Sequence, residues 1–379
     1  PLSHDVSEEV SCFNIRGNKY YFLSGPKTLI DNLCTFQRGM VLFSKEKVGS
    51  KISVSEAYQI CEEMTRSAST SFLRSFKSLP AEKRSSVHAL YAFCRKVDDI
   101  VDGDWLPDLS VLEKEEILDL NQRAEYRAIA LGIERMSEPA NNDKNHFQRV
   151  RALLWFRDNL DAIDSGLDVK HPIFIALKDT LEKFPIRISD LKLLIEGMED
   201  DLFPTNYQSF EDLRGYCFKV ASTVGLSLIE IYGYTDPDAR EYAEEMGIFL
   251  QMVNVLRDIQ EDRERGRLYL PTDELEIFNI KPEEIENINL ASSKKWKRFM
   301  KHYINRTKTH RNIALNLIPL VEKDSRRNPH MMCAVYSSIV SEAERRNGDV
   351  LSKRLQLGFM RKIGFALSAL GLWSISARK

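Results

Sequence analysis

Residues 91–102 read YAFCRKVDDIVD, and residues 251–262 read QMVNVLRDIQED. In both stretches the apolar residues recur at the spacing of one face of an α-helix, and two aspartates four residues apart share another face. The pairs are Asp98 with Asp102 and Asp258 with Asp262. Each stretch therefore predicts an amphipathic helix whose polar stripe carries two carboxylates.

The helical period continues through most of the 379 residues, with Gly and Pro at the ends of the periodic segments. Alternating runs of β-branched residues are scarce, so the predicted fold class is all-α. We expect helices at about 54–77, 81–102, 111–132, 146–164, 171–182, 189–203, 209–232, 236–262, 293–321, 329–347 and 358–373.

The first 50 residues differ in texture from the rest of the chain. Cys12 to Leu23 (CFNIRGNKYYFL) is the one extended-looking part and could form a hairpin around Arg16-Gly17-Asn18. No Pro/Gly/Ser-rich linker divides the remainder. We therefore expect an N-terminal arm or flap at 1–50 and a single helical domain at 51–379.

Charge and cysteine content exclude several classes of protein. The chain has 54 Lys and Arg against 56 Asp and Glu, a net charge of −2, which argues against a protein that coats nucleic acid. Its six cysteines are scattered without a CxxC pair, which predicts reduced thiols and no zinc site. No stretch approaches the roughly 20 apolar residues of a membrane span, and the first residues lack the features of a signal peptide.

The first acidic stripe admits two interpretations. Asp98 and Asp102 would lie about 6 Å apart along a helix, where like charges repel, and Arg95 lies one turn before Asp98. Such a pair is typical either of a solvated helix end or of a site for a hard cation. Mg²⁺ suits one or two carboxylates together with substrate phosphate oxygens, and Mn²⁺ is an alternative.

The second stripe favours the cation site. Asn254 and Gln251 extend the stripe of Asp258 and Asp262 toward the start of the helix, and the following segment, DRERGRLYLP, adds three arginines. Arginine can contact phosphate oxygens bidentately, so the two stripes and the arginines together suit a magnesium-bound diphosphate. The alternative is a salt-bridged helix end followed by a turn containing Gly.

From about Val54 to the C-terminus the chain resembles the squalene and phytoene synthases, which join two prenyl diphosphates head to head. Four blocks come in the order and spacing of that family. They are YAFCRKVDDIVD, EGMEDDL (196–202), YCFKVASTVG (216–225) and NVLRDIQEDRERGRLYLP (254–271). Head-to-tail elongating enzymes and terpene cyclases share the first type of motif, but NVLRDIQED matches the second motif of neither well.

The resemblance implies an isoprenoid synthase fold with both aspartate motifs facing a central cavity. The residues it implies as catalytic are Asp98, Asp102, Asp258, Asp262, Tyr216 and Arg95. The four aspartates, with Asn254, match the positions that hold magnesium. The residues implied in substrate binding are Ser69, Phe72 and Phe76 of SASTSFLRSF, Tyr91, Ala221, Val224, Gly225, Gln251, Asn254, Arg257, Arg267 and Tyr336. Arg257 could equally pair with its acidic neighbour, and the small residues could serve close helix packing.

Several products are compatible with these motifs. The blocks look closest to phytoene synthases, which implies geranylgeranyl diphosphate as substrate and carotenoid biosynthesis. The alternatives are a squalene, dehydrosqualene or presqualene diphosphate synthase that uses farnesyl diphosphate, with NADPH required only if squalene is the product. A non-catalytic assembly factor of the same fold is the alternative from another class, and the retention of all four aspartates argues against it.

The C-terminal segment LGFMRKIGFALSALGLWSISARK has basic residues around a short apolar run. Such a segment could lie on a bilayer surface through 358–375, with Trp373 as an anchor, or pack on the core as an ordinary helix. We expect a cytoplasmic or plastid-type stromal protein at the periphery of a membrane.

Overall fold

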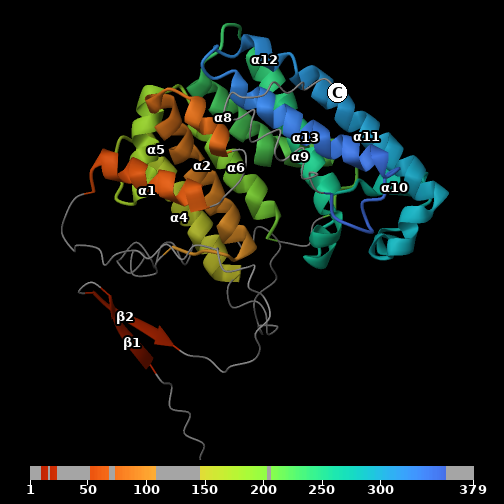
Figure 1. Cartoon of the computed structure of the whole chain (residues 1–379), viewed down its shortest axis with the longest axis horizontal. Coiled ribbons are helices and arrows are strands. Elements are labelled where there is room, and N and C mark those ends of the chain that lie inside the picture. The colour runs from red at the N-terminus through yellow and green to blue at the C-terminus, as the bar shows by residue number, and fades with distance from the viewer. Residues whose placement is uncertain are drawn as a thin grey trace, which may run out of the picture. The chain divides into compact units, whose positions relative to one another are not determined.

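A computed structural model describes residues 10–15, 18–23, 52–67, 73–107, 146–202 and 206–355. The chain divides into two compact units, Pro1–Glu46 and Lys47–Lys379. In the first unit, strands β1 (Val10–Ile15) and β2 (Asn18–Leu23) pair antiparallel, with Val10 opposite Leu23 (Figure 1). This confirms the predicted hairpin, while the function of the arm stays a prediction.

The described part of the second unit is helical, as predicted. Its elements are α1 (Val54–Ser67), the 3₁₀ helix η1 (Leu73–Ser78), α2 (Ala81–Asp102), α4 (His146–Asp164), α5 (Pro172–Lys183), α6 (Ile188–Asp200), α7 (Phe210–Cys217), the π-helical turn η3 (Phe218–Ser222), α8 (Thr223–Tyr232), α9 (Ala239–Glu264), α10 (Thr272–Ile277), the 3₁₀ helices η4 (Pro282–Glu286) and η5 (Ile288–Ser292), α11 (Lys294–Ala314), α12 (Leu317–Leu320) and α13 (Arg327–Arg345).

Helices α8 and α9 lie side by side in the middle of this unit. Helices α2 and α6 pack against α8, and α1, α4 and α5 lie beyond α2, whereas α11, α12 and α13 pack against α9 (Figure 1). The fully buried side chains include Phe93 of α2, Phe249 of α9 and Trp296 of α11. One core therefore joins helices from both ends of the unit, and the two predicted aspartate stripes lie on helices within it.

Two local features fix where α2 ends and where α7 begins, and these helices carry the motifs around Asp98 and Tyr216. Helix α2 ends directly after Asp102 because Gly103 adopts the left-handed conformation, with φ of 80°, that glycine tolerates best. Helix α7 begins at a capping box in which Ser209 Oγ accepts from the Asp212 amide at 3.2 Å and the Asp212 carboxylate accepts from the Ser209 amide at 2.9 Å.

Some predicted helices are wrong in detail. The helix predicted at 54–77 ends at Ser67, and a 3₁₀ helix follows at Leu73–Ser78. The helix predicted at 209–232 widens into a π-helical turn at Phe218–Ser222. The helix predicted at 293–321 breaks after Ala314, and Pro319 lies in the short helix that follows. The predicted helices 111–132 and 358–373 lie outside the described residues.

Candidate active site

A cavity of about 740 Å³ lies between α2, η3, α8, α9 and α13. Most of its lining is apolar. Asn254 and Arg257 of α9 and Arg354 form a polar end of the lining, where Arg257 and Arg354 both contact Asp258. Cys94 also lines it, but burial raises the pKa of this thiol to about 12, so it stays protonated at neutral pH. An apolar chamber with one polar end suits a ligand that has a long hydrocarbon part and a charged head.

The two acidic stripes meet at that polar end, which we call the mouth. Asp98 lies one turn beyond Cys94 on α2, and Asp258 follows Arg257 on α9. Arg265 and Arg267, which follow α9, reach back to Asp102 at the end of α2, and their Nη1 atoms lie 2.9 and 3.6 Å from its Oδ1. The segment after the second motif therefore contacts the first motif directly.

Arginines neutralise three of the four aspartates. Arg95 Nη1 lies 3.0 Å from Asp98 Oδ2. Asp258 accepts from Arg257 Nε at 2.9 Å and from Arg354 Nη2 at 2.7 Å. Arg265 serves Asp102. The predicted alternative that Arg257 pairs with its acidic neighbour is therefore what the structure shows.

Burial and neighbouring carboxylates raise the pKa of two aspartates in the site, Asp98 and Asp262. Asp98 keeps 41% of its side chain exposed, yet partial burial, and then the charge of Asp102, raise its pKa to about 6. Burial, and then the charge of Asp258, raise the pKa of Asp262 to about 7. Each shift means that the folded chain resists a negative charge here unless a cation accompanies it.

Asp262→Asn is expected to stabilise the metal-free protein in a pH-dependent way. The folded pKa of about 7 lies above the unfolded value near 3.8, so the folded state binds more protons between these limits and the free energy of unfolding falls as the pH rises. Asparagine removes that loss. At pH 8 in EDTA we expect a gain of about 1–2 kcal/mol in urea unfolding, after discounting for partial exposure, which vanishes near pH 4.

Glu264→Gln is the matched control, because Glu264 is an exposed carboxylate at the end of the same helix. It is expected to change stability by less than about 0.5 kcal/mol at either pH. An equal gain for Asp262→Asn at pH 8 and pH 4 would show that the carboxylate is not strained by its charge.

A buried carboxylate beside the mouth joins three of the sequence blocks. Asp201, at the end of EGMEDDL, is 7% exposed and accepts hydrogen bonds from Tyr216 at 2.7 Å and Tyr269 at 2.6 Å. The two tyrosine rings stack with centroids 5.0 Å apart. Burial raises the pKa of Asp201 to about 6, while Arg267 opposes the shift. This network fixes Tyr216 and Tyr269 relative to the two acidic stripes.

Comparison with known proteins identifies the family. Residues 65–361 match the family described as squalene/phytoene synthase. The chain belongs to this family. It is 30% identical to the 15-cis-phytoene synthase of Synechococcus elongatus over 323 residues, covering 82% of this chain and 91% of the relative. It is 31% identical to a chloroplastic phytoene synthase of an Oncidium hybrid cultivar over 330 residues, covering 84% of this chain and 69% of the relative.

A solved structure supports the fold. A dehydrosqualene synthase in complex with a ligand superposes with a TM-score of 0.65 at 21% identity, covering 84% of this chain and 96% of that one. The predicted all-α isoprenoid synthase fold is therefore confirmed. As a squalene/phytoene synthase family member the protein is a prenyltransferase, and the relatives support head-to-head condensation of prenyl diphosphates as its reaction.

The structure gathers most of the residues predicted to bind substrate. Those that line the cavity are Phe76, Tyr91, Ala221, Val224, Gly225, Gln251, Asn254, Arg257 and Tyr336. Arg267 is an exception, because it contacts Asp102 and does not line the cavity. Tyr216, which was predicted as catalytic, lies in the tyrosine cluster around Asp201 and does not line the cavity either. Ser69 and Phe72 lie outside the described residues. The roles of all these residues stay predictions.

Three residues near the site had no expected role. Arg354 lines the cavity and contacts Asp258, which is 96 positions earlier in the chain. Asp201 contacts tyrosines 15 and 68 positions away. Tyr232 lines the cavity from the last residue of α8. The block EGMEDDL pointed toward Asp201, whereas no sequence signal singled out Arg354 or Tyr232.

The donor set at the mouth fits a hard divalent cation. Carboxylate and amide oxygens are the ligands that Mg²⁺ accepts, and Asn254 Oδ1 is buried without a hydrogen-bond partner among the described residues. Within the same residues, no three His, Cys, Asp or Glu side chains converge in a metal-binding cluster. The carboxylate and amide oxygens at the mouth are therefore of the type that binds Mg²⁺. Three of the four aspartates are paired with arginines, which a bound cation would replace.

Membrane contact was predicted for 358–375, which lies outside the described residues. Among the helices that the structure does describe, none is both long and apolar enough to cross a bilayer. Peripheral contact and the compartment stay predictions.

Proposed function

We propose that this protein joins two molecules of geranylgeranyl diphosphate head to head, through a cyclopropylcarbinyl diphosphate, to give phytoene. The observation that carries the proposal is an apolar cavity whose polar end brings both aspartate stripes together. Phytoene synthases from a cyanobacterium and a plant, each at least 30% identical, support the choice of substrate.

The mouth supplies the groups that a diphosphate needs. Arg95, Arg257, Arg265, Arg267 and Arg354 all lie there, and a guanidinium can hold two phosphate oxygens at once. Each now contacts an aspartate. Asp98, Asp102, Asp258, Asp262 and Asn254 would hold Mg²⁺, which supplies positive charge to the leaving diphosphate. Arginines displaced from the aspartates would then be free to bind the phosphate oxygens.

The cavity wall can protect a reactive carbocation. Most of its lining is apolar, which disfavours water beside a bound prenyl chain, and Tyr91, Tyr232 and Tyr336 are among the lining residues. Burial raises the pKa of Tyr91 and Tyr336 above the ordinary value, so these hydroxyls stay neutral and do not act as anionic nucleophiles. Ala221 of η3 is a small residue of the cavity wall. Gly225 of α8 also lines the cavity, but a Cβ there would lie 3.0 Å from the Ala243 carbonyl oxygen, so this glycine serves close packing against α9. Two prenyl chains can therefore react side by side without capture by solvent.

The test is an incubation of the purified protein with Mg²⁺ and either farnesyl or geranylgeranyl diphosphate, each with and without NADPH. Hydrocarbons and diphosphates are extracted and identified by mass spectrometry. We expect a C40 hydrocarbon from geranylgeranyl diphosphate that does not depend on NADPH.

Other outcomes assign the protein differently. A C30 product would overturn the choice of substrate, and dependence on NADPH would then separate squalene from dehydrosqualene. Accumulated presqualene diphosphate would indicate an enzyme that stops after the first half-reaction. Failure of a folded protein to convert either substrate would contradict the catalytic proposal and favour an assembly factor.

A further inference from the structure

A polar network around Lys83 lies at the start of α2, at the opposite end of this helix from Asp98 and the mouth. Lys83 lies in the first turn of α2, and Asp98 lies 15 residues further along the same helix, which corresponds to about 22 Å at 1.5 Å per residue. The α2 residues that line the cavity, Val87 to Cys94, lie between these two points. Lys83 is therefore at the distal end, where the tail of a bound prenyl chain would lie.

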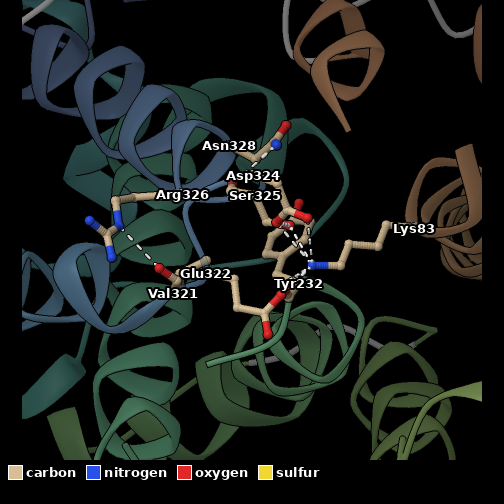
Figure 2. A network of polar contacts seen from close by, with 8 residues as sticks. All are labelled: Lys83, Tyr232, Val321, Glu322, Asp324, Ser325, Arg326 and Asn328. Atoms are coloured by element: carbon tan, nitrogen blue, oxygen red, sulfur yellow. Dashed lines mark hydrogen bonds and ion pairs between the residues drawn. The ribbon is translucent and has the colours of Figure 1, made fainter. Parts of the chain in front are cut away.

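The Lys83 ammonium group has an acceptor for each of its three protons. Nζ lies 2.7 Å from the carbonyl oxygen of Tyr232, 2.7 Å from Glu322 Oε2 and 2.9 Å from Asp324 Oδ1 (Figure 2). The Lys83 side chain is only 16% exposed. Burial alone would lower its pKa, but hydrogen bonds to Glu322 and Asp324 outweigh that effect and raise it. Lys83 is therefore charged at any physiological pH.

These contacts tie the start of α2 to the end of α8 and to the loop between α12 and α13. The Glu322 amide donates to the carbonyl of Gly233 at 3.0 Å. Gly233 has φ of +76°, and a Cβ there would lie 2.5 Å from the Glu322 carboxyl carbon. Glycine thus allows the Glu322 carboxylate to approach α8 closely enough to share Lys83 with Tyr232.

The loop is fixed internally as well. Arg326 Nε donates to the Val321 carbonyl at 3.0 Å, and Asn328 Nδ2 donates to the Ser325 carbonyl at 3.2 Å (Figure 2). Ser325 and Asn328 are fully buried. Pro329, the next residue, lines the cavity. A displacement of the Lys83 partners would therefore be passed to the cavity wall.

The segments that Lys83 joins form part of that wall. Tyr232 lines the cavity, and its carbonyl accepts a hydrogen bond from Lys83. Leu317, Pro329 and Met331, on either side of the loop, line it too. We propose that Lys83 is a positioning residue that holds the distal wall in place and so limits the length of the prenyl chain that the cavity accepts. This inference rests on the proposed function.

Loss of the Lys83 charge would loosen the wall for a simple electrostatic reason. Glu322 and Asp324 both lie within hydrogen-bond distance of one Nζ atom, so without it two carboxylates would face each other and repel. The Tyr232 carbonyl would lose the same donor. The loop and the end of α8 would then separate, which would deepen the cavity at its distal end.

The test is Lys83→Met, which keeps an unbranched side chain one atom shorter and removes its three donors. The kcat and KM are measured separately with C15, C20 and C25 prenyl diphosphates. We expect the ratio of kcat/KM for C25 over C20 to rise by about tenfold, which is the scale of discrimination that hydrophobic wall contacts provide. The increase should come mainly from a lower KM for the C25 substrate.

Lys308→Met is the matched control, because Lys308 pairs with Glu344 between α11 and α13 and lines no part of the cavity. Its C25 to C20 ratio should equal that of the unmodified protein. If Lys83→Met does not fold, the double variant Glu322→Gln with Asp324→Asn weakens the same contacts from the partners' side, because neutral amides are poorer acceptors for an ammonium group than carboxylates. It should shift the ratio in the same direction but by less, since no carboxylates remain to repel each other.

The outcomes separate this inference from the proposed function. If the unmodified protein converts none of the three substrates, the proposed function fails. If it is active and a folded Lys83 variant keeps the same ratio, or if Lys308→Met shifts the ratio equally, the role of Lys83 in chain length is wrong.

Discussion

Asp258→Asn is expected to lower kcat by about 10³-fold or more, because the predicted cation would lose a carboxylate ligand at the mouth. Stabilisation of a leaving group by a metal ion contributes several kcal/mol, and each 1.36 kcal/mol corresponds to a factor of ten in rate. Asparagine keeps the size and one oxygen of the side chain but not the charge. The variant therefore tests charge and not shape.

The arginines give this prediction a second signature. Asp258 neutralises Arg257 and Arg354, and it is only 17% exposed. In the variant both guanidinium groups lose Asp258 as an anionic partner, although Arg354 keeps Glu261, and both become more available to the substrate diphosphate. KM should therefore stay the same or fall while kcat collapses, which distinguishes loss of the cation from loss of substrate binding.

Glu261→Gln is the matched control. Glu261 lies on the same helix and contacts the same Arg354, at 2.8 Å, but it is 47% exposed and is not one of the predicted ligands. Its kcat should stay within about threefold of the unmodified enzyme, the range expected for a lost surface ion pair. An Asp258→Asn enzyme that kept more than roughly a tenth of its kcat would rule out this carboxylate as an essential ligand.

Helical periodicity predicted the elements that carry the site because they are long. The α2 and α9 helices extend over 22 and 26 residues, so their apolar faces and aspartate stripes were visible in sequence alone. The small residues Ala221 and Gly225 were also predicted at the cavity, where the structure places them. Long periodic segments and motif spacing were therefore sufficient to predict the two helices that carry the aspartates and the small residues of the cavity wall.

Tertiary contacts decided what the sequence could not reveal. The hydrogen-bond partners of Asp201 are tyrosines elsewhere in the chain, and Arg354 contacts an aspartate 96 positions away. Neither contact can be read from the local sequence. The π-helical turn at Phe218–Ser222 adds residues within what the pattern predicted as one helix, and the helical period does not signal such a turn. These features depend on which backbones approach one another, and periodicity carries no information about that approach.

One such approach is between Gly247 of α9 and the π-helical turn. A Cβ at Gly247 would lie 2.4 Å from the Cα of Ser222 and 2.8 Å from the carbonyl carbon of Ala221. Ser222 is fully buried, and its Oγ donates to the Glu244 carbonyl at 2.7 Å. The two backbones are therefore in direct contact. The atoms nearest to a Cβ at Gly247 are backbone atoms, so no side chain could rotate away to make room for it.

Gly247→Ala is expected to destabilise the protein by about 3 kcal/mol or more, at the upper end of the cost of overpacking, because backbone on both sides must move. Gly215→Ala is the matched control, since a Cβ at this exposed helical glycine meets nothing within 4 Å. That variant should gain about 0.5–1 kcal/mol from the lower entropy of its unfolded chain. Both are measured by urea unfolding.

The sign of the two changes decides the interpretation. Loss at Gly247 together with a gain at Gly215 would show that contact between α9 and the turn, and not helix propensity, selects glycine at residue 247. Because α9 carries Asp258 and the turn begins two residues after Tyr216, separating them would also misalign the mouth. Gly247→Ala should therefore lose activity in the fraction that remains folded, and a stable, fully active variant would contradict the close contact.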